Sequence, residues 1–352
     1  MKSWPDQRAL QLLGIQTPII QAPMAGVDTP ALAAAVSNAG GLGSLACAML
    51  SPDQIRTAWA AMRLETDKPL NLNFFCHQQN EKSLPQQEKW QARLAPYYAE
   101  FGIDPETIPS SATRAPFDEN FCSVIEELKP SIVSFHFGLP SPDLLDRVKM
   151  TGAVILSSAT TVEEAIWLEQ NGCDAIIAQG GDAGGHRAMF MTQDIGTQID
   201  TADLLPQIVK AVSVPVIAAG GIADANGIRN ALAQGAEAVQ LGTAYLFCPE
   251  ARVSPLYREA LKSNNATVLT NVFSGRPARG IVNRFINEIG PISADAPDFP
   301  YASHLVMPLR NASEKSGSHD FMQMWSGKIR RPHNMNARDL TIKLSEDTLG
   351  IL

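Results

Sequence analysis

The sequence is poor in charge, and basic residues are the scarcer sign. Charged residues make up 18% of the 352 positions, and 28 Lys and Arg stand against 36 Asp and Glu, for a net charge of −8. Proteins that bind nucleic acid through its phosphates need a basic surface. We therefore expect no nucleic-acid partner.

Cysteine is also sparse and lacks a pattern. The five cysteines are odd in number and include no C-x-x-C pair; they are Cys47, Cys76, Cys122, Cys173 and Cys248. A disulfide framework or a structural zinc site would need paired spacings. We predict reduced thiols that are mostly buried as small apolar side chains.

Long hydrophobic runs are missing. No stretch approaches the roughly 20 apolar residues that a membrane-spanning helix needs. The first residues, Met-Lys-Ser-Trp-Pro-Asp, lack the apolar segment of a secretory signal. We expect no membrane partner and a cytoplasmic location. Both a monomer and a homodimer are compatible with the sequence.

Short apolar runs alternate with helical patterns over the first 250 residues. Hydrophobic residues make up 45% of the chain, enough for a sizeable core. Open doubly wound sheets rarely sustain eight strand–helix units without reversing, so the alternation predicts an α/β fold of the (β/α)8 TIM-barrel type. The eight predicted strands are 18–26, 41–46, 69–75, 131–136, 153–157, 174–178, 214–219 and 238–243.

Local sequence signals mark several helix starts. Thr29 followed by Pro30 is a suitable cap and first-turn pair. Ser51 with Gln54 three residues later has the spacing of a capping box. The other predicted helices are 119–128, 142–150, 161–170, 201–212 and 224–234.

Two segments depart from this alternation. Residues 77–117 are rich in Gln, Glu and Lys and then helical in pattern, which favours an insertion after the third strand, over the barrel mouth. Residues 251–352 are rich in Pro, Asn and Ser, and we predict a C-terminal helical extension that packs on the barrel as a lid. Residues 1–250 would then form the barrel domain.

The stretch from Gln179 to His186 holds four glycines and a histidine directly after a predicted buried strand. Glycine lets the backbone approach a ligand closely and adopt positive φ. Barrel enzymes place their chemistry at the carboxyl ends of the strands. The pattern therefore favours a ligand-binding loop with a functional histidine over a surface turn with an incidental one.

Other chemistries are poorly supported at the predicted strand ends. Asp182 is the only carboxylate there, which argues against a paired-carboxylate hydrolase. Only His136 and His186 are placed to meet, without an acid cluster, so no catalytic metal is expected. The serine-hydrolase pattern G-x-S-x-G is absent.

Glycines also follow the seventh and eighth predicted strands, in Gly220-Gly221 and Gly242-Thr243. Barrels commonly hold a phosphate at these two strand ends through backbone N–H groups and a helix N-terminus. Taken with the glycine loop and the turn after the first strand, the pattern favours a planar cofactor that carries a phosphate. FMN fits best, with its ring over the barrel mouth against Met24.

Four stretches resemble the signature stretches of the nitronate monooxygenases, once called 2-nitropropane dioxygenases. They are residues 21–26, 179–186, 218–222 and 240–243, and residues 134–138 resemble the additional motif of the class I group. The resemblance implies FMN contacts at Asn73, Gln179, Gly184, Gly221 and 240–243. Together with the strand-end argument, the predicted cofactor-binding residues are Pro23, Met24, Ala25, Asn73, Gln179, Gly180, Gly184, Gly185, Gly220, Gly221, Gln240, Leu241, Gly242 and Thr243.

The same resemblance implies an FMN-dependent oxidation of alkyl nitronates by O2 to carbonyl compounds and nitrite. His186 would be the active-site histidine and His136 a second catalytic candidate. An imidazole near neutral pH can accept the α-proton of a nitroalkane, whereas a nitronate needs no proton removed. Two alternatives stay open: an FMN-dependent NAD(P)H:quinone or enoyl-thioester reductase, and a flavin-binding protein without activity.

Several residues have two interpretations. His136 is either a substrate contact or a core histidine, and Met24 either packs under the flavin or reacts. For Asp182 we favour a role in holding the glycine loop over a role in proton transfer. Arg276 and Arg279 either help to hold the phosphate or substrate, or are solvated.

Overall fold

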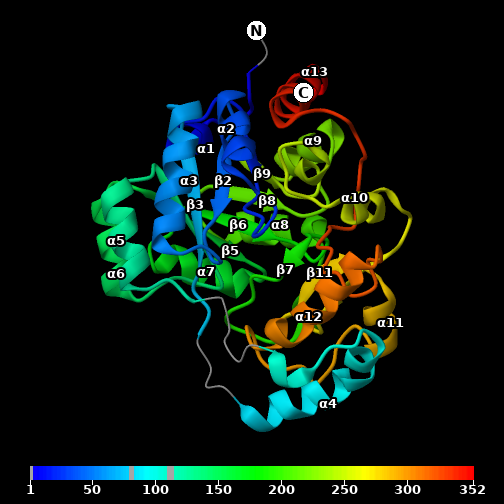
Figure 1. Cartoon of the computed structure of the whole chain (residues 1–352). Helices are drawn as coiled ribbons and strands as arrows, with labels where there is room; N and C mark the ends of the chain where they lie inside the picture. The colour runs from blue at the N-terminus through cyan, green and yellow to red at the C-terminus, as the bar shows by residue number, and fades with distance from the viewer. Residues whose placement is uncertain (1–2, 79–82, 109–114) are drawn as a thin grey trace.

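Eight strands of the chain form a parallel barrel sheet (Figure 1). The computed structural model describes residues 3–78, 83–108 and 115–352; residues 79–82 and 109–114 of the predicted insertion lie outside the described part. The barrel strands are β1 (Ile19–Gln21), β2 (Gly43–Ala46), β3 (Leu70–Phe75), β4 (Ile132–His136), β5 (Val154–Ala159), β6 (Ala175–Gln179), β8 (Val216–Ala219) and β9 (Ala238–Leu241).

The sheet closes on itself. Its strand order is β1-β9-β8-β6-β5-β4-β3-β2, with parallel pairing throughout. The two outer strands of this order meet through Leu42, whose amide donates to Ile19 O at 3.0 Å and whose carbonyl accepts from Gln21 N at 2.9 Å. The predicted (β/α)8 barrel is therefore confirmed.

Helices surround the barrel and also build the rest of the molecule (Figure 1). Thr29 caps α2 by accepting from Leu32 N, and Ser51 and Gln54 form both bonds of the capping box of α3, as predicted. The helices are α1 (Arg8–Leu13), α2 (Pro30–Asn38), α3 (Pro52–Glu65), α4 (Leu84–Glu100), α5 (Glu119–Leu128), α6 (Pro142–Met150), α7 (Val162–Gln170), α8 (Thr201–Ala211), α9 (Ala225–Ala233), α10 (Pro255–Lys262), α11 (Arg284–Ile289), α12 (Ala302–Lys315) and α13 (Ala337–Ile351), with 3-10 turns η1 (Pro105–Thr107), η2 (Ile195–Thr197) and η3 (Tyr245–Phe247).

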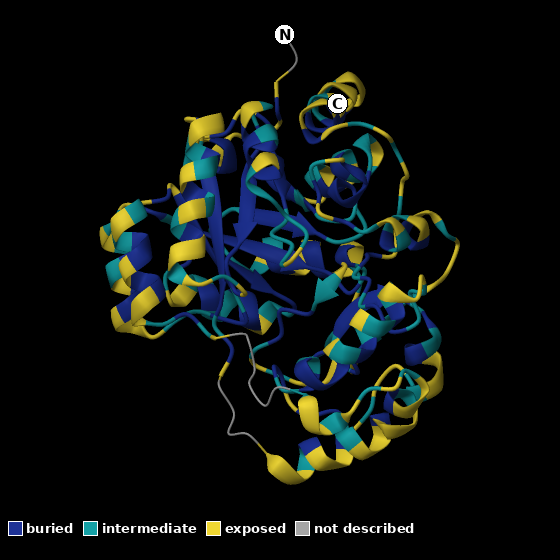
Figure 2. Cartoon of the chain, viewed as in Figure 1, coloured by how far each residue is buried: buried dark blue, intermediate teal, exposed yellow. Residues whose placement is uncertain are grey.

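Two apolar layers hold the barrel together. Side chains such as Leu72 and Phe74 belong to the large cluster that the barrel shares with its surrounding helices. A second cluster joins barrel residues such as Ile20 and Ile177 to Leu10 of α1. Figure 2 shows the barrel strands largely buried and the helices exposed on their outer faces. The barrel interior is thus packed, and helix α1, which the periodicity did not reveal, packs against it.

The C-terminal segment is not only helical, in contrast to the prediction. It contains β10 (Thr267–Thr270) and β11 (Ala278–Ile281), which pair antiparallel, and β11 also pairs with β7 (Gly185–His186) of the glycine loop. The four-residue runs were too short to distinguish from loops, and one partner strand lies about ninety residues upstream. This small sheet connects the glycine loop to the C-terminal segment.

The predicted insertion packs against the C-terminal segment. Helix α4 contributes Trp90, Leu94 and Tyr98 to a cluster with Phe285 and Leu309, and the Tyr98 hydroxyl donates to Leu305 O at 2.7 Å. These elements form the lower lobe in Figure 1. The proposed domain boundary at residue 250, and the lid roles of the insertion and the extension, stay predictions.

The expectations for the cysteines and for membrane-spanning helices can also be compared with the structure. All five cysteines are free and all but Cys76 are buried, as predicted. None of the helices in the described ranges is long and apolar enough to cross a bilayer.

Candidate active site

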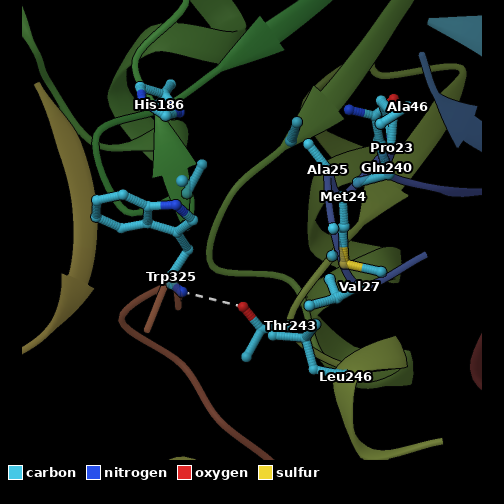
Figure 3. Close-up of a pocket in the computed structure, with 18 of the residues that line it drawn as sticks. Pro23, Met24, Ala25, Val27, Ala46, His186, Gln240, Thr243, Leu246 and Trp325 are labelled. Carbon is cyan, nitrogen blue, oxygen red and sulfur yellow. Dashed lines mark hydrogen bonds between the residues drawn. The ribbon is translucent and has the colours of Figure 1, made fainter. Parts of the chain in front are cut away.

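A cavity of about 530 Å³ opens at the carboxyl ends of the barrel strands. Figure 3 shows the β1 turn on one side of it and His186 with Trp325 on the other. The structure brings most of the predicted site residues to this cavity: Pro23, Met24, Ala25, Asn73, His136, Gln179, Gly184, Gly185, His186, Gly220, Gly221, Gln240, Gly242 and Thr243.

Two predicted cofactor-binding residues, Gly180 and Leu241, do not line the cavity. A Cβ on Gly180 would lie 2.2 Å from the backbone nitrogen of Thr201, so this glycine allows helix α8 to approach strand β6. The Leu241 side chain belongs to the core between barrel and helices. Within β3, Asn73 lines the cavity, whereas Asn71 donates to Ser44 and Ser134 in the neighbouring strands.

His186 is held by a short strand and an aromatic environment. It pairs with Ala278 in the register of β7 and β11, and its Nε2 lies 2.9 Å from Ser274 Oγ. The imidazole packs edge-on against Trp325 and Phe299, with ring centroids at 5.4 and 5.5 Å. The side chain predicted to carry the chemistry therefore has a defined place at the cavity wall.

His136 also lines the cavity and lies next to the main chain of His186. Its Nε2 is 3.3 Å from the carbonyl oxygen of His186, and its Nδ1 is 3.4 Å from Ser158 Oγ. Burial, followed by the charges of Arg276 and Arg187, lowers the pKa of His136 to about 3, against the opposing effect of the bond to His186. The His136 ring is therefore neutral at physiological pH, and a neutral ring can hold the main chain of His186 through this hydrogen bond.

The opposite wall is the turn that follows β1. The carboxylate of Asp28 accepts hydrogen bonds from Met24 N at 2.9 Å and from Ala46 N at 2.8 Å, and so ties the ends of β1 and β2 together. Burial raises the pKa of Asp28 to about 7, despite the bonds from these backbone amides. Figure 3 shows Pro23, Met24, Ala25 and Val27 along this wall.

Three charged side chains brace the glycine loop from behind. Arg187 is fully buried and donates to Gly180 O at 2.7 Å. Arg279 Nε donates to Gly181 O at 2.6 Å. Asp182 accepts from Thr201 Oγ1 at 2.5 Å and from Thr201 N at 3.2 Å, and so ties the glycine loop to the start of α8.

The two arginines with open roles do not line the cavity; Arg279 is buried and Arg276 is partly buried. Arg279 is buried against the glycine loop. The guanidinium of Arg276 lies 3.9 Å from the ring centroid of Phe137 and donates to Met189 O. Both therefore support the loop and the segment that follows it.

The strand ends predicted to hold a phosphate are lined by backbone. Gly220 and Gly221 have φ of 123° and 64°, a region that favours glycine. A Cβ on Gly242 would meet only Ala22 Cβ at 3.5 Å and Met24 Sδ at 3.8 Å, both ordinary contacts. The amide of Gly327 donates to Thr243 Oγ1 at 3.0 Å, the dashed line in Figure 3.

Several cavity residues were not foreseen from the sequence. Many come from the C-terminal segment, which has no periodic pattern that would mark them. The fold places this segment across the cavity: Tyr257 donates its hydroxyl to Trp325 O, and Lys328 N donates to Asp182 O at 3.0 Å. The unforeseen lining residues include Phe75, Ser158, Tyr257, Arg310, Glu314 and Trp325.

In the part of the chain that the structure describes, no three His, Cys, Asp or Glu side chains gather in a way that could hold a metal ion. A closed (β/α)8 barrel with a glycine-lined cavity at its strand ends, and an imidazole on the cavity wall, is the arrangement of a barrel enzyme.

Known proteins define this class further. The family model described as nitronate monooxygenase matches residues 6–347. The chain is 44% identical to the nitronate monooxygenase of Pseudomonas aeruginosa, over 91% of this chain and 93% of the relative. It is 43% identical to that of Paraburkholderia phytofirmans, over 91% and 88%. The chain belongs to the nitronate monooxygenase family, whose members are flavin-dependent enzymes, as predicted.

Solved structures agree with this assignment. A nitroalkane oxidase from Streptomyces ansochromogenes superposes with a TM-score of 0.87 at 36% identity, over 98% of both chains. FabK from Thermotoga maritima superposes with a TM-score of 0.70 at 26% identity, over 98% of this chain and 96% of that chain.

Proposed function

We propose that this chain is an FMN-dependent nitronate monooxygenase that oxidises alkyl nitronates with O2 to carbonyl compounds and nitrite. The observation that carries the proposal is the position of His186, on the wall of a glycine-lined cavity and across from the β1 turn. Family membership over residues 6–347 supports it. The monomeric or homodimeric state and the cytoplasmic location stay predictions.

The cavity suits the proposed cofactor in two respects. Gln240 lines the cavity, and its Oε1 is buried without a hydrogen-bond partner in the described structure, so an acceptor is available to a ligand with N–H groups. Gly242 lines the cavity without a side chain, so a ligand can approach the backbone there. FMN, when bound, supplies the electron acceptor for the nitronate and the site that reacts with O2.

Each wall of the cavity has its own task in this proposal. Backbone groups at Gly220, Gly221 and Gly242 would hold the phosphate, and Met24 and Gln240 would contact the ring. His186 would orient the nitronate and, for a neutral nitroalkane, accept the α-proton. The neutral His136 would donate to the His186 carbonyl oxygen and keep that residue in place.

One set of measurements on the purified chain tests the proposal. We expect a yellow protein with about one releasable FMN per chain, and nitrite release from a preformed alkyl nitronate in the presence of O2. Anaerobic NADH should leave the flavin oxidised. Bleaching of the flavin by NADH without nitrite release would favour the quinone or enoyl-thioester reductase. If the protein shows neither reaction, the remaining interpretation is a flavin-binding protein without activity.

A further inference from the structure

The hydroxyl of Ser274 contacts the ring of His186. Ser274 is fully buried, and its Oγ lies 2.9 Å from His186 Nε2. The residue is 88 positions away in the sequence and belongs to the loop that leads into β11, the strand that pairs with His186. Both the backbone and the ring of His186 therefore depend on the same segment.

The other contacts of the hydroxyl show which atom carries the proton. Ser274 Oγ donates to Arg276 O at 3.2 Å and accepts from Arg276 N at 3.4 Å. A serine hydroxyl has one hydrogen to donate and two lone pairs that accept. With its hydrogen directed to Arg276 O, its remaining lone pair can only accept from the ring. In the opposite arrangement, two acceptors would compete for one hydrogen.

The loop leaves Ser274 little freedom to move. The next residue, Gly275, has φ of 84°, and a Cβ there would lie 1.9 Å from Pro297 O. Two residues further on, Pro277 O accepts from Arg187 N at 2.8 Å. A turn packed this closely fixes the hydroxyl relative to the histidine.

We propose that Ser274 is a positioning residue for His186: its hydroxyl accepts from Nε2–H and holds the imidazole in the tautomer whose basic nitrogen is Nδ1. The catalytic consequence rests on the proposed function, because a fixed tautomer matters to a proton acceptor. The tautomer itself can be measured without turnover.

The first test observes the ring directly in the flavin-loaded protein. Two-bond ¹H–¹⁵N spectra of histidine-labelled protein, recorded where the ring is neutral, distinguish the two tautomers. The His186→Asn variant identifies the signals of His186. We expect one species protonated at Nε2 in the parent. A ring protonated at Nδ1, or a mixture of tautomers in the parent, would overturn the proposal even if no Ser274 variant folds.

The second test removes the hydroxyl. Ser274→Ala should convert the His186 signals to a mixture of tautomers and lower turnover of a neutral nitroalkane on the order of 10- to 100-fold, with flavin content unchanged. The acidic limb of its pH profile, where protonation of His186 removes the base, should move to lower pH, because the imidazolium loses an acceptor that favours the charged form. An unchanged Nε2–H signal in this variant would contradict the proposal.

Ser37→Ala is the matched control. Ser37 is also buried and makes two bonds, donating to Pro69 O at 2.8 Å and accepting from Gly43 N at 3.0 Å. Ser37→Ala should leave the His186 signals and the pH profile unaltered. If it causes the same changes as Ser274→Ala, those changes come from a general loss of packing and the proposal is overturned. A parent with the Nε2–H tautomer but without nitrite release would overturn the proposed function and leave the assignment of Ser274 intact.

Discussion

At the scale of single residues, two histidines line the cavity and differ in their contacts. His186 contacts Ser274 and the aromatic rings, whereas the Nε2 of His136 faces the main chain of His186. The two imidazoles are therefore expected to have different tasks: His186 would act on the substrate, and His136 would support it. Each assignment leads to a separate prediction.

His186→Asn should distinguish proton removal from electron transfer. Turnover of neutral nitroalkanes should fall about 10²- to 10⁴-fold, the usual loss of a general base. Oxidation of preformed nitronates should fall less, because no α-proton has to be removed. Nitrite release from both substrates, at equal flavin content, measures the difference. If the variant turns over both nitronates and nitroalkanes at the parent's rate, His186 has no catalytic role.

His136 should make the protein less stable in acid. Its pKa is about 3 in the folded protein, below the ordinary value of 6.5, so between these pH values only the unfolded chain takes up the proton. The contribution of the neutral His136 ring to the free energy of unfolding is fully present above pH 6.5 and is lost as the pH falls toward 3. In this window the free energy of unfolding changes by up to about 1.4 kcal/mol per pH unit. His136→Asn should flatten the dependence of unfolding free energy on pH in this window. Parallel curves for parent and variant would show that the ring is not buried in its neutral form.

At the scale of elements, the strand ends carry glycines for different physical reasons. A Cβ on Gly221 would lie 2.1 Å from Asp182 Oδ2, and one on Gly180 would meet helix α8. Gly242 differs because a Cβ there would make only ordinary contacts, with Ala22 Cβ at 3.5 Å and Met24 Sδ at 3.8 Å. Only a substitution at Gly242 therefore adds bulk at the proposed phosphate site without an immediate clash with the protein.

Gly242→Val should yield a folded protein with little or no bound flavin. The branched side chain would occupy space that the proposed phosphate needs, while its Cβ contacts with Ala22 and Met24 stay ordinary. The ratio of flavin absorbance to protein absorbance after purification measures the effect. Gly350→Ala, where an added Cβ meets no neighbour within 4 Å, serves as the control. Undiminished flavin in the valine variant would place the phosphate elsewhere.

At the scale of the whole molecule, the cavity is shared between the barrel and the C-terminal segment. Barrel strand ends supply the glycines and His186, and the residues after 250 supply Tyr257, Arg310 and Trp325. The insertion helix α4 in turn packs on α12 of the same segment. The integrity of the site thus depends on packing far from the barrel axis.

Trp90→Ala tests this dependence. Trp90 is completely buried in the cluster between α4 and the C-terminal segment, so its truncation should cost about 3–5 kcal/mol. Denaturant unfolding measures the loss, and nitrite release and flavin content show whether the cavity is affected. Leu84→Ala, on the same helix but 60% exposed, should change little. A variant as stable as the parent would mean that α4 does not contribute to the cooperative core.

The sequence alone determined the features that depend on neighbouring residues. Alternating apolar runs predicted the eight barrel strands, and Thr29, Ser51 and Gln54 predicted helix starts, because periodicity and capping act within a few residues. The glycine loop and His186 could be assigned to a strand end for the same reason. Since parallel barrel strands all end at one face, most predicted site residues came together at one cavity.

Only the tertiary structure decided which side chains face one another across long separations. Residues far apart in the chain meet in this way at the site. Arg279 donates to Gly181 O of the glycine loop, and Ser274 and Trp325 both contact the ring of His186. Gly180 lies at a strand end as predicted, yet its missing side chain makes room for a helix. Such contacts depend on how whole helices and strands pack, so the local sequence pattern does not predict them.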